Sequence, residues 1–390
     1  MATSRKVLVP IADGTEPMEA VIIADVLRRA GAIVTIASAS ASLTVLARFD
    51  VKIVADVFVS DIVDTSFDLI AIPGGIPGVE NLRDCKVLEG LVKKHVEEGR
   101  LYAAVCAAPA VVLGPWGLVN GLKATCFPSL MEKLASYGAT TVESRVQVDG
   151  KLVTSRAPGT TMEFAVALIE QLLGKVKAEH VAGPLVMRYN HDDEHTFKEF
   201  NLVQWTCDNP PKILVPITYG SEEMETVIII DILRRAKANV VVTAAIREEV
   251  TGLHGVNLVA DTLIKEAVQL SYDLVVLPGG DNGAASLTNE YYLVKLLEKQ
   301  RDSNKYYGAI CASVTTIFER HGLLKGKKAT AYPLKCNMLL DQSAAENRVV
   351  VDGNLITSKS PGTGIEFALA IVEKLFGRQL ALDIAKALVF

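Results

Sequence analysis

Short apolar runs alternate with amphipathic segments along the whole chain. In the first half the apolar runs cover residues 6–12, 32–38, 67–75 and 101–106, which predicts buried strands. The segments 18–31, 87–99 and 159–174 carry apolar residues at helical spacing, and each ends in a glycine, as helices often do. Strands and helices in alternation predict an α/β fold with a mostly parallel, doubly wound sheet.

Two shorter patterns complete this arrangement. Residues 145–155 (RVQVDGKLVTS) contain Asp149-Gly150, a dipeptide typical of a hairpin turn between two strands. Residues 108–118 open a further helix with Pro109 in the first turn, where the missing N–H of proline costs nothing.

The whole pattern occurs twice. The stretch LVPIADGTEPMEAVIIADVLRRAGA from Leu8 returns as LVPITYGSEEMETVIIIDILRRAKA from Leu214, and two further blocks, from Gly117 and Glu143, return in the same order about 205 residues later. FDLIAIPGGIPGVENL from Phe67 likewise returns as YDLVVLPGGDNGAASL. We therefore expect two copies of one domain, residues 5–175 and 212–390, separated by a connector at 176–211.

The later part of this connector, about residues 187–211, is charged at first and closes with Pro210-Pro211. His191 and His195 flank two aspartates there, so a metal site is conceivable. The polar composition favours a solvated linker instead.

Composition and charge narrow the class of protein. The chain has 390 residues and a net charge of −5, which gives no electrostatic reason to expect nucleic acid or an anionic membrane as partner. The six cysteines include no CxxC pair, which fits a reducing compartment. The first residues leave no room for a signal or transit peptide, and no apolar run is long enough to span a bilayer. We expect a soluble protein of the cytoplasm, with a nuclear fraction also open.

Three loops per copy lie at carboxyl ends of predicted strands, where sites form in such sheets. The pairs in the two copies are Glu19 and Glu225, Gly74-Gly75 and Gly279-Gly280, and Cys106 and Cys311. A cysteine between a strand and a helix N-terminus has the geometry of a nucleophile elbow, where free N–H groups favour the thiolate. Backbone N–H groups of the glycine loop and of the following alanine, Ala107 or Ala312, could hold an oxyanion, and the glutamate could move a proton.

Each of these residues also has a plainer interpretation. A cysteine at a strand end is usually a small buried residue, a glutamate in the first turn complements the helix dipole, and a glycine pair can serve a turn. Of the six cysteines only Cys106 and Cys311 recur between the copies, which favours a shared chemical role.

The segments EPMEAV…DVLRRAG, DLIAIPGG, AAVCAAPA and TSRAPGTTMEFAVALIE resemble the DJ-one/PfpI (ThiJ) superfamily, specifically its DJ-one branch. The resemblance covers both copies nearly end to end, and the tandem arrangement of the chain resembles that of the two-domain plant members. It implies two flavodoxin-like domains related to class I glutamine amidotransferases, with Cys106 and Cys311 at nucleophile elbows and Glu19 and Glu225 as their protonated partners. It also implies pairing of the two copies within the chain, with further homo-oligomers open.

The activity that the resemblance implies is that of a glutathione-independent glyoxalase, also called D-lactate dehydratase, acting on small 2-oxoaldehydes such as methylglyoxal. Such an enzyme needs no cofactor and no metal and would protect against carbonyl and oxidative stress. The alternative is a redox-sensing chaperone or protein deglycase that uses the oxidisable cysteine without efficient glyoxalase turnover. Protease or amidotransferase activity would need a histidine base, and no histidine recurs between the copies.

Two features depart from the pattern of the superfamily. Many members carry a histidine before the proline that follows the KAT strand, and Phe127 and Tyr332 stand there instead. The base would then be the glutamate alone, or Tyr332 through its hydroxyl in the second copy. The second copy also lacks a proline equivalent to Pro109, so we expect a looser elbow at Cys311.

Overall fold

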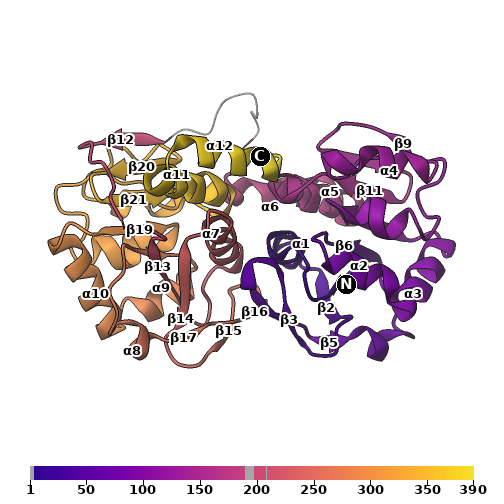
Figure 1. Ribbon diagram of the computed structural model, residues 1–390, viewed down its shortest axis with the longest axis horizontal. Coiled ribbons are helices and arrows are strands. Elements are labelled where there is room, and N and C mark those ends of the chain that lie inside the picture. The colour runs from indigo at the N-terminus through magenta and orange to yellow at the C-terminus, as the bar shows by residue number, and fades with distance from the viewer. Residues whose placement is uncertain (1–3, 189–196, 208) are drawn as a thin grey trace. The chain divides into compact units, whose positions relative to one another are not determined.

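The computed structural model describes residues 4–188, 197–207 and 209–390, and it divides into two compact units (Figure 1). Unit 1 comprises Met1–Gly183 with Leu388–Phe390, and unit 2 comprises Pro184–Ala387. His191 and His195 lie outside the described residues. None of the described helices is both long enough and apolar enough to cross a membrane.

Unit 1 is built on a seven-stranded sheet with the order β10-β11-β7-β6-β1-β2-β5, in which only the pair β10–β11 is antiparallel. Its strands are β1 (Lys6–Ile11), β2 (Ile33–Ser38), β5 (Val57–Phe58), β6 (Leu69–Ile72), β7 (Leu101–Val105), β10 (Val146–Asp149) and β11 (Leu152–Ser155). Two short pairs stand apart from this sheet, the antiparallel β3 (Thr44–Leu46) and β4 (Lys52–Val54), and the parallel β8 (Lys123–Ala124) and β9 (Thr140–Thr141).

The central strands of unit 1 are apolar on both faces because helices cover both. From β1 the chain crosses to β2 on one side, and from β6 it crosses to β7 on the other, so right-handed crossovers place the connecting helices on opposite faces. On one face α1 packs against α5, and on the other α2 packs against α3. The helices of unit 1 are α1 (Pro17–Arg29), α2 (Gly78–Asp84), α3 (Lys86–Glu97), α4 (Met131–Ser136) and α5 (Thr161–Leu173), with α6 (Lys175–Leu185) leading into unit 2 and 3-10 turns η1 (Arg48–Asp50), η2 (Val59–Ile62), η4 (Pro128–Leu130) and η5 (Pro158–Thr160).

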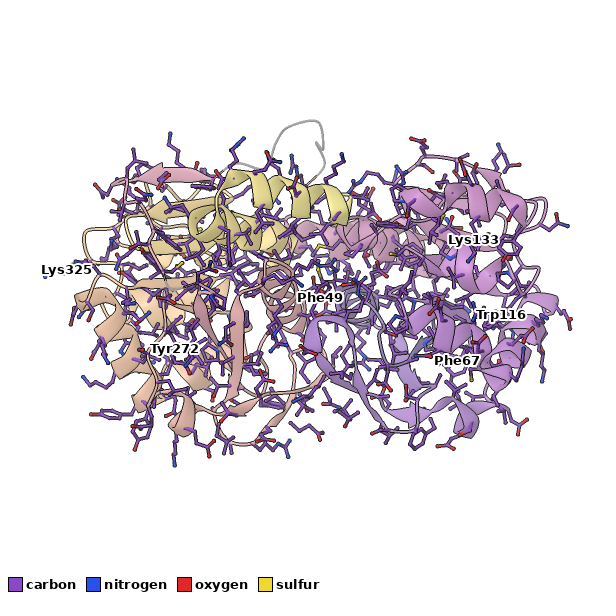
Figure 2. All side chains as sticks on the ribbon, viewed as in Figure 1. Phe49, Phe67, Trp116, Lys133, Tyr272 and Lys325 are labelled. Carbon is purple, nitrogen blue, oxygen red and sulfur yellow. The ribbon has the colours of Figure 1, made fainter. Side chains whose placement is uncertain are left out.

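Unit 2 repeats this plan with one strand more, in the order β12-β20-β21-β19-β18-β13-β14-β17. Its strands are β12 (Lys198–Phe200), β13 (Lys212–Ile217), β14 (Asn239–Ala244), β17 (Thr262–Leu263), β18 (Leu274–Leu277), β19 (Tyr306–Ile310), β20 (Val349–Asp352) and β21 (Leu355–Ser358), with a separate hairpin of β15 (Glu249–Thr251) and β16 (Asn257–Val259). Its helices are α7 (Glu223–Arg235), α8 (Ile264–Ala267), α9 (Asp281–Leu287), α10 (Tyr291–Asp302), α11 (Gly364–Phe376) and α12 (Arg378–Leu388), with 3-10 turns η7 (Pro333–Met338) and η8 (Pro361–Thr363). Phe67 and Tyr272 hold matching buried places just before β6 and β18 (Figure 2).

The predicted α/β class with two tandem domains is confirmed, and the predicted hairpin around Asp149-Gly150 is β10–β11. The helix predicted from Pro109 is instead a short π-helical segment, η3 (Pro109–Leu113), and its counterpart in unit 2 is η6 (Val314–Glu319). A wide π turn displaces the backbone locally, which is common at functional sites.

In each unit one arginine joins two separate segments of the chain by binding a backbone carbonyl of each, a contact that we call the arginine clamp. In unit 1 Arg145 donates to the Gly159 carbonyl at 2.8 Å and to the Val389 carbonyl at 2.9 Å, and a Cβ on Gly159 would lie 2.7 Å from the Leu388 carbonyl. In unit 2 Arg348 binds the carbonyls of Gly362 and Val186 in the same manner, each at 3.0 Å. Unit 1 thus takes its last segment from residues 388–390 rather than from the end of α6.

The expected connector contains ordered structure that packs on unit 2. Its strand β12 pairs in parallel with β20, in the register Lys198 to Val350. The Trp205 ring stacks on Tyr306 with centroids 4.2 Å apart, and the indole N–H donates to the Gly353 carbonyl at 2.9 Å. The side chain of Trp205 is buried, so this segment is part of unit 2 rather than a solvated linker.

We predict that Trp205→Ala lowers the free energy of unfolding of unit 2 by about 3 kcal/mol, because a large aromatic side chain and a buried hydrogen bond are lost. Far-UV circular dichroism of the full chain during chemical denaturation measures the change, and Trp116 fluorescence reports the unfolding of unit 1 separately. Leu202→Ala in the same segment is the control, since Leu202 is 80% exposed and its loss should change stability by less than about 0.5 kcal/mol. Equal stability of the two variants would show that the segment contributes little.

Candidate active site

The two recurring cysteines lie at sharp turns at the carboxyl ends of β7 and β19. Cys106 has a φ of 63° and Cys311 a φ of 62°, a left-handed conformation that side chains other than glycine rarely adopt. Each turn is held by the neighbouring strand, because the N–H of Cys106 donates to the Ser155 carbonyl and that of Cys311 to the Ser358 carbonyl, both at 3.0 Å. The residue after each cysteine begins a helical turn, so the local backbone is that of a nucleophile elbow.

Glu19 and Glu225 lie in the first turns of α1 and α7 and are fully buried. The Glu19 carboxyl accepts a hydrogen bond from the Gly74 N–H at 2.6 Å, and Glu225 accepts one from Gly279 at the same distance. Although 87 residues separate Glu19 from Cys106, the fold brings both side chains against Gly74, where the carboxyl is close enough to the sulfur to raise the pKa of the thiol. A buried carboxyl beside a thiol is the pair that the sequence predicted.

Gly74 is the residue that allows this approach. A Cβ at Gly74 would lie 2.7 Å from the Cys106 Cβ and 2.8 Å from Glu19 Oε2, and Gly279 has the same tight contacts with Cys311 and Glu225. The next glycine, Gly75, has a φ of 93°, and a Cβ there would lie 2.2 Å from the Glu16 nitrogen. Both glycines are therefore required by space, and the Gly74 N–H is engaged by Glu19.

Burial raises the pKa of the Cys106 thiol well above its usual range, and the negative charges of Glu19 and Glu16 raise it further. The Ala107 N–H opposes this shift by hydrogen bonding to the sulfur, which is the effect expected from the turn alone. The pKa of Cys311 is raised in the same way by burial, Glu225 and Glu222, against the Ala312 N–H. The thiol and the carboxyl disfavour being charged together, so the ionisation of each cysteine is coupled to that of its neighbouring glutamate.

The residue that stands where many superfamily members have a histidine differs between the two units. The Phe127 N–H donates to the Cys106 carbonyl at 2.7 Å, so Phe127 adjoins the elbow but offers no group that can accept a proton. Tyr332 holds the matching place before η7 and is partly buried. The looser elbow expected at Cys311 is not seen, because its φ matches that of Cys106 and Ser313 adds a hydrogen bond to the Pro278 carbonyl at 2.6 Å.

A second buried glutamate per unit was missed in the sequence. Glu16 is 1% exposed and Glu222 is 3% exposed, and their charges act on the cysteines. The Arg48 guanidinium lies 3.7 Å from Glu16 Oε2 in unit 1. The repeat contained the signal, since Glu16 recurs as Glu222 just as Glu19 recurs as Glu225.

Unit 2 differs from unit 1 in the residue that follows this second glutamate. Glu223, where unit 1 has Pro17, is buried and accepts hydrogen bonds from the N–H groups of His254 and Val256, the shortest at 3.0 Å. Burial and the charge of Glu222 raise the pKa of Glu223 from 4.5 to about 7, although both N–H groups lower it. Unit 2 therefore carries a carboxyl that titrates near neutral pH.

The groups that meet at each elbow are a thiol, buried carboxyls and backbone N–H groups, which suits nucleophilic addition and proton transfer. Each unit is a flavodoxin-like α/β domain with a cysteine elbow. The model of the DJ-1/PfpI family matches residues 5–171 and 211–374, and the chain belongs to this family.

Relatives share the tandem arrangement over nearly the full length. The chain is 59% identical over 387 residues to Protein DJ-1 homolog B of Arabidopsis thaliana, covering 99% of this chain and 88% of that protein. It is 54% identical to Protein DJ-1 homolog A of the same plant, covering 98% of each. Over 184 residues it is 35% identical to the Glutathione-independent glyoxalase DJR-1.2 of Caenorhabditis elegans, covering 47% of this chain and 96% of that one.

We predict that the free energy of unfolding of unit 2 falls by about 3 kcal/mol as the pH rises from about 4.5 to about 7, because folded Glu223 holds its proton over a range in which the unfolded chain has lost it. Glu223→Gln should remove this part of the pH dependence while keeping an oxygen for the N–H groups. Denaturant unfolding of the full chain at several pH values measures it. The control is Glu248→Gln at an exposed loop position, and an identical slope in the two variants would contradict the assignment.

Proposed function

We propose that the protein is a cofactor-independent glyoxalase that converts methylglyoxal to lactate at its Cys–Glu pairs. The observation that supports this most is the pair itself: in both units a fully buried carboxyl and a thiol at a strained elbow lie against the same glycine, close enough for the carboxyl to raise the pKa of the thiol. Conversion of a 2-oxoaldehyde to a 2-hydroxy acid needs a nucleophile for the aldehyde and one group that moves protons, and this pair supplies both.

The first step is addition of the Cys106 sulfur to the aldehyde carbon. The proton shared with Glu19 moves to the aldehyde oxygen, and a hemithioacetal forms. The new oxygen lies beside the Gly75 N–H and the Ala107 N–H, which would stabilise negative charge on it. Because the Gly74 N–H is engaged by Glu19, the next N–H along that loop is the one assigned to the oxyanion.

In the second step the ionised Glu19 takes the proton from the former aldehyde carbon, which gives an enediolate. The same carboxyl returns that proton to the neighbouring carbon while the hydroxyl proton passes from the first oxygen to the second, and the product is a lactoyl thioester on Cys106. Water then cleaves the thioester, releasing lactate and restoring the thiol, so that methylglyoxal plus water gives lactic acid. No electrons are exchanged with an outside partner.

Because Phe127 carries no group that can accept a proton, the base in unit 1 must be a carboxylate, and we assign this role to Glu19. In unit 2 the Tyr332 hydroxyl stands at the matching position, and Glu225 is assigned the role of Glu19. The C. elegans relative with the printed name of a glutathione-independent glyoxalase supports the reaction class. Pairing of the two copies within the chain, and a place in the cytoplasm or nucleus, stay predictions.

We predict that the purified full-length protein forms lactate from methylglyoxal without glutathione, and that the double variant Cys106→Ser/Cys311→Ser loses at least about 10²-fold in rate, because each site loses its nucleophile. The two single variants assign the activity to each unit. An enzymatic lactate assay measures it, and Cys85→Ser, at a cysteine that does not recur, is the matched control. Unchanged turnover in the double variant, or no lactate from the wild type, would overturn the proposal. In the second case, sulfinate on Cys106 after mild peroxide treatment would favour the redox-sensing alternative.

Glu19→Gln in a Cys311→Ser background separates reactivity from turnover. We expect lactate formation to fall by about 10²–10⁴-fold, because the amide cannot carry the proton. Alkylation of Cys106 by iodoacetamide at pH 8 should become faster, because the charge that raises the thiol pKa is gone. Loss of both turnover and alkylation would instead indicate a collapsed site.

A further inference from the structure

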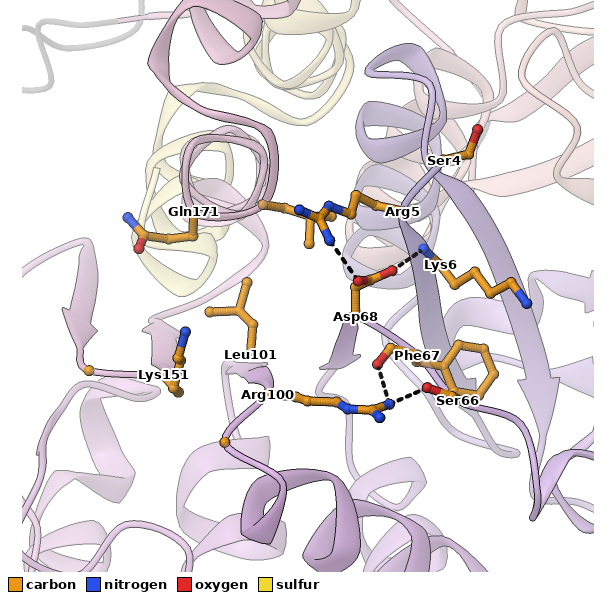
Figure 3. A pocket seen from close by; sticks show the side chains of 13 residues that line it. Ser4, Arg5, Lys6, Ser66, Phe67, Asp68, Arg100, Leu101, Lys151 and Gln171 are labelled. Carbon is orange, nitrogen blue, oxygen red and sulfur yellow. Dashed lines mark hydrogen bonds and ion pairs between the residues drawn. The ribbon is translucent and has the colours of Figure 1, made fainter. Parts of the chain in front are cut away.

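Unit 1 has a pocket at the amino ends of its parallel strands, at the edge of the sheet opposite Cys106 (Figure 3). The cavity has a volume of about 620 Å³ and lies between the starts of β1, β6 and β7, the β10–β11 turn and the end of α5. Nothing in the proposed reaction uses this surface.

The pocket is basic. Arg5, Lys6, Arg100 and Lys151 line it, and Asp68 is its one acidic lining residue. Asp68 is engaged by the Arg5 guanidinium at 3.0 Å and by the Lys6 N–H at 2.8 Å (Figure 3). Within the described part of the chain, the ammonium groups of Lys6 and Lys151 form no ion pair. The surface therefore has positive charge to offer an acidic partner.

Unit 2 shows what the matching surface binds. There the connector residues 198–207 lie over the same place, which the repeat identifies position by position. Trp205 contacts Gly353, the counterpart of Gly150, and stacks on Tyr306, the counterpart of Leu101. The occupied surface in unit 2 and the open pocket in unit 1 are thus equivalent parts of one fold.

The sheet edge beside the pocket differs in the same way. In unit 2 the strand β12 covers β20, whose residues are buried, and the Gly353 N–H donates to the Phe200 carbonyl at 3.1 Å. Among the described residues of unit 1 no strand lies beyond the matching strand β10, and the Val148 side chain on β10 is 37% exposed. An uncovered edge strand is a template for a further strand.

We propose that unit 1 binds an extended acidic peptide segment, which adds as a parallel strand to β10 and places an aromatic side chain in the pocket. The occupant has the plan of residues 198–205, in which the aromatic residue follows the strand by five positions. Main-chain hydrogen bonds along β10 supply affinity, and the pocket supplies specificity.

The charges favour an acidic segment over a neutral one. In unit 2 Glu199 of the connector forms an ion pair with Lys374 at 2.5 Å. A basic side chain of the domain thus binds an acidic side chain on the added strand. Unit 1 has Gln171 at that place, but it has Lys151 where unit 2 has Asn354 and Arg5 where unit 2 has Pro211. Compared with the matching surface of unit 2, the pocket of unit 1 carries more positive charge and carries it at other positions. A peptide with acidic side chains near its aromatic residue would therefore complement this pocket.

The test uses the full-length chain and a fluorescein-labelled peptide of residues 197–206, FKEFNLVQWT, with binding followed by fluorescence anisotropy. We expect saturable binding below about 1 mM, and tighter binding when the peptide carries Gln204→Glu, next to the aromatic residue. A peptide with Trp205→Ala should bind about tenfold more weakly, because the anchor is lost.

Variants of unit 1 locate the site. The N–H of Gly353 points toward β12, and so does the N–H of Val351, because N–H directions alternate along a strand. The unit 1 counterpart of Val351 is Val148. Val148→Pro removes an outward N–H at an edge position that tolerates proline, and should weaken binding about tenfold, whereas Val148→Thr should leave it unchanged. Lys151→Glu should reverse the preference for the acidic peptide. Unchanged lactate formation in these variants keeps this test separate from that of the proposed function.

Three results would overturn the proposal. One is no binding of any peptide up to about 1 mM. Another is binding that Val148→Pro and Lys151→Glu do not alter, which would place the peptide elsewhere, such as on unit 2 in exchange for its own connector. The third is displacement of the peptide by inorganic pyrophosphate in a manner that depends on Lys151, together with equal binding of the peptides with and without Trp205. This result would make the pocket a site for small anions.

Discussion

The contact on which both sites depend is the hydrogen bond from the Gly74 N–H to the buried Glu19 carboxyl, with its equivalent from Gly279 to Glu225. A carboxyl is costly to bury unless its oxygens are paired, and this bond supplies a partner within a layer of side chains that excludes water. The donor must also be a glycine, because a side chain at Gly74 would overlap both the carboxyl and the Cys106 Cβ. The strained cysteine, the small residues after it and the tight glycine loop are all consequences of bringing a carboxyl and a thiol together in a closed space.

This closeness explains why the elbow behaves differently from an isolated thiol at a helix start. The backbone N–H of Ala107 favours the thiolate, but the carboxyl and burial together outweigh it when Glu19 is ionised. Charge on one member of the pair therefore depends on the proton of the other. A substrate that accepts the proton on its oxygen as the sulfur attacks never requires the two anions to coexist, and the pair then presents a base for the next step. The pair suits reactions in which addition and proton transfer are coupled.

Much of this could be predicted from the sequence because two kinds of signal were strong. The alternation of apolar strands and amphipathic helices, written twice, determined the fold class, and recurrence singled out Cys106 and Cys311 among six cysteines. The π-helical turn after each cysteine could not be predicted, since it arises from packing around the elbow rather than from local propensity. Glu16 was overlooked although it recurs, because its burial and its effect on the sulfur depend on tertiary contacts. The packed connector was also missed, because a polar segment with one tryptophan gives a weak strand signal until the edge it covers is known.

The arginine clamps have a consequence for the order in which the protein is made. Arg145 binds the Val389 carbonyl, and residues 388–390 belong to unit 1, so the first copy to leave the ribosome is the last to be completed. Arg348 in unit 2 binds Val186, which is synthesised before the rest of that unit, so unit 2 has its clamp segment from the start. During synthesis the Gly159 surface of unit 1 stays open while about two hundred further residues are added, at roughly 5–20 residues per second. Removal of residues 388–390 would thus destabilise unit 1, the domain that is translated first.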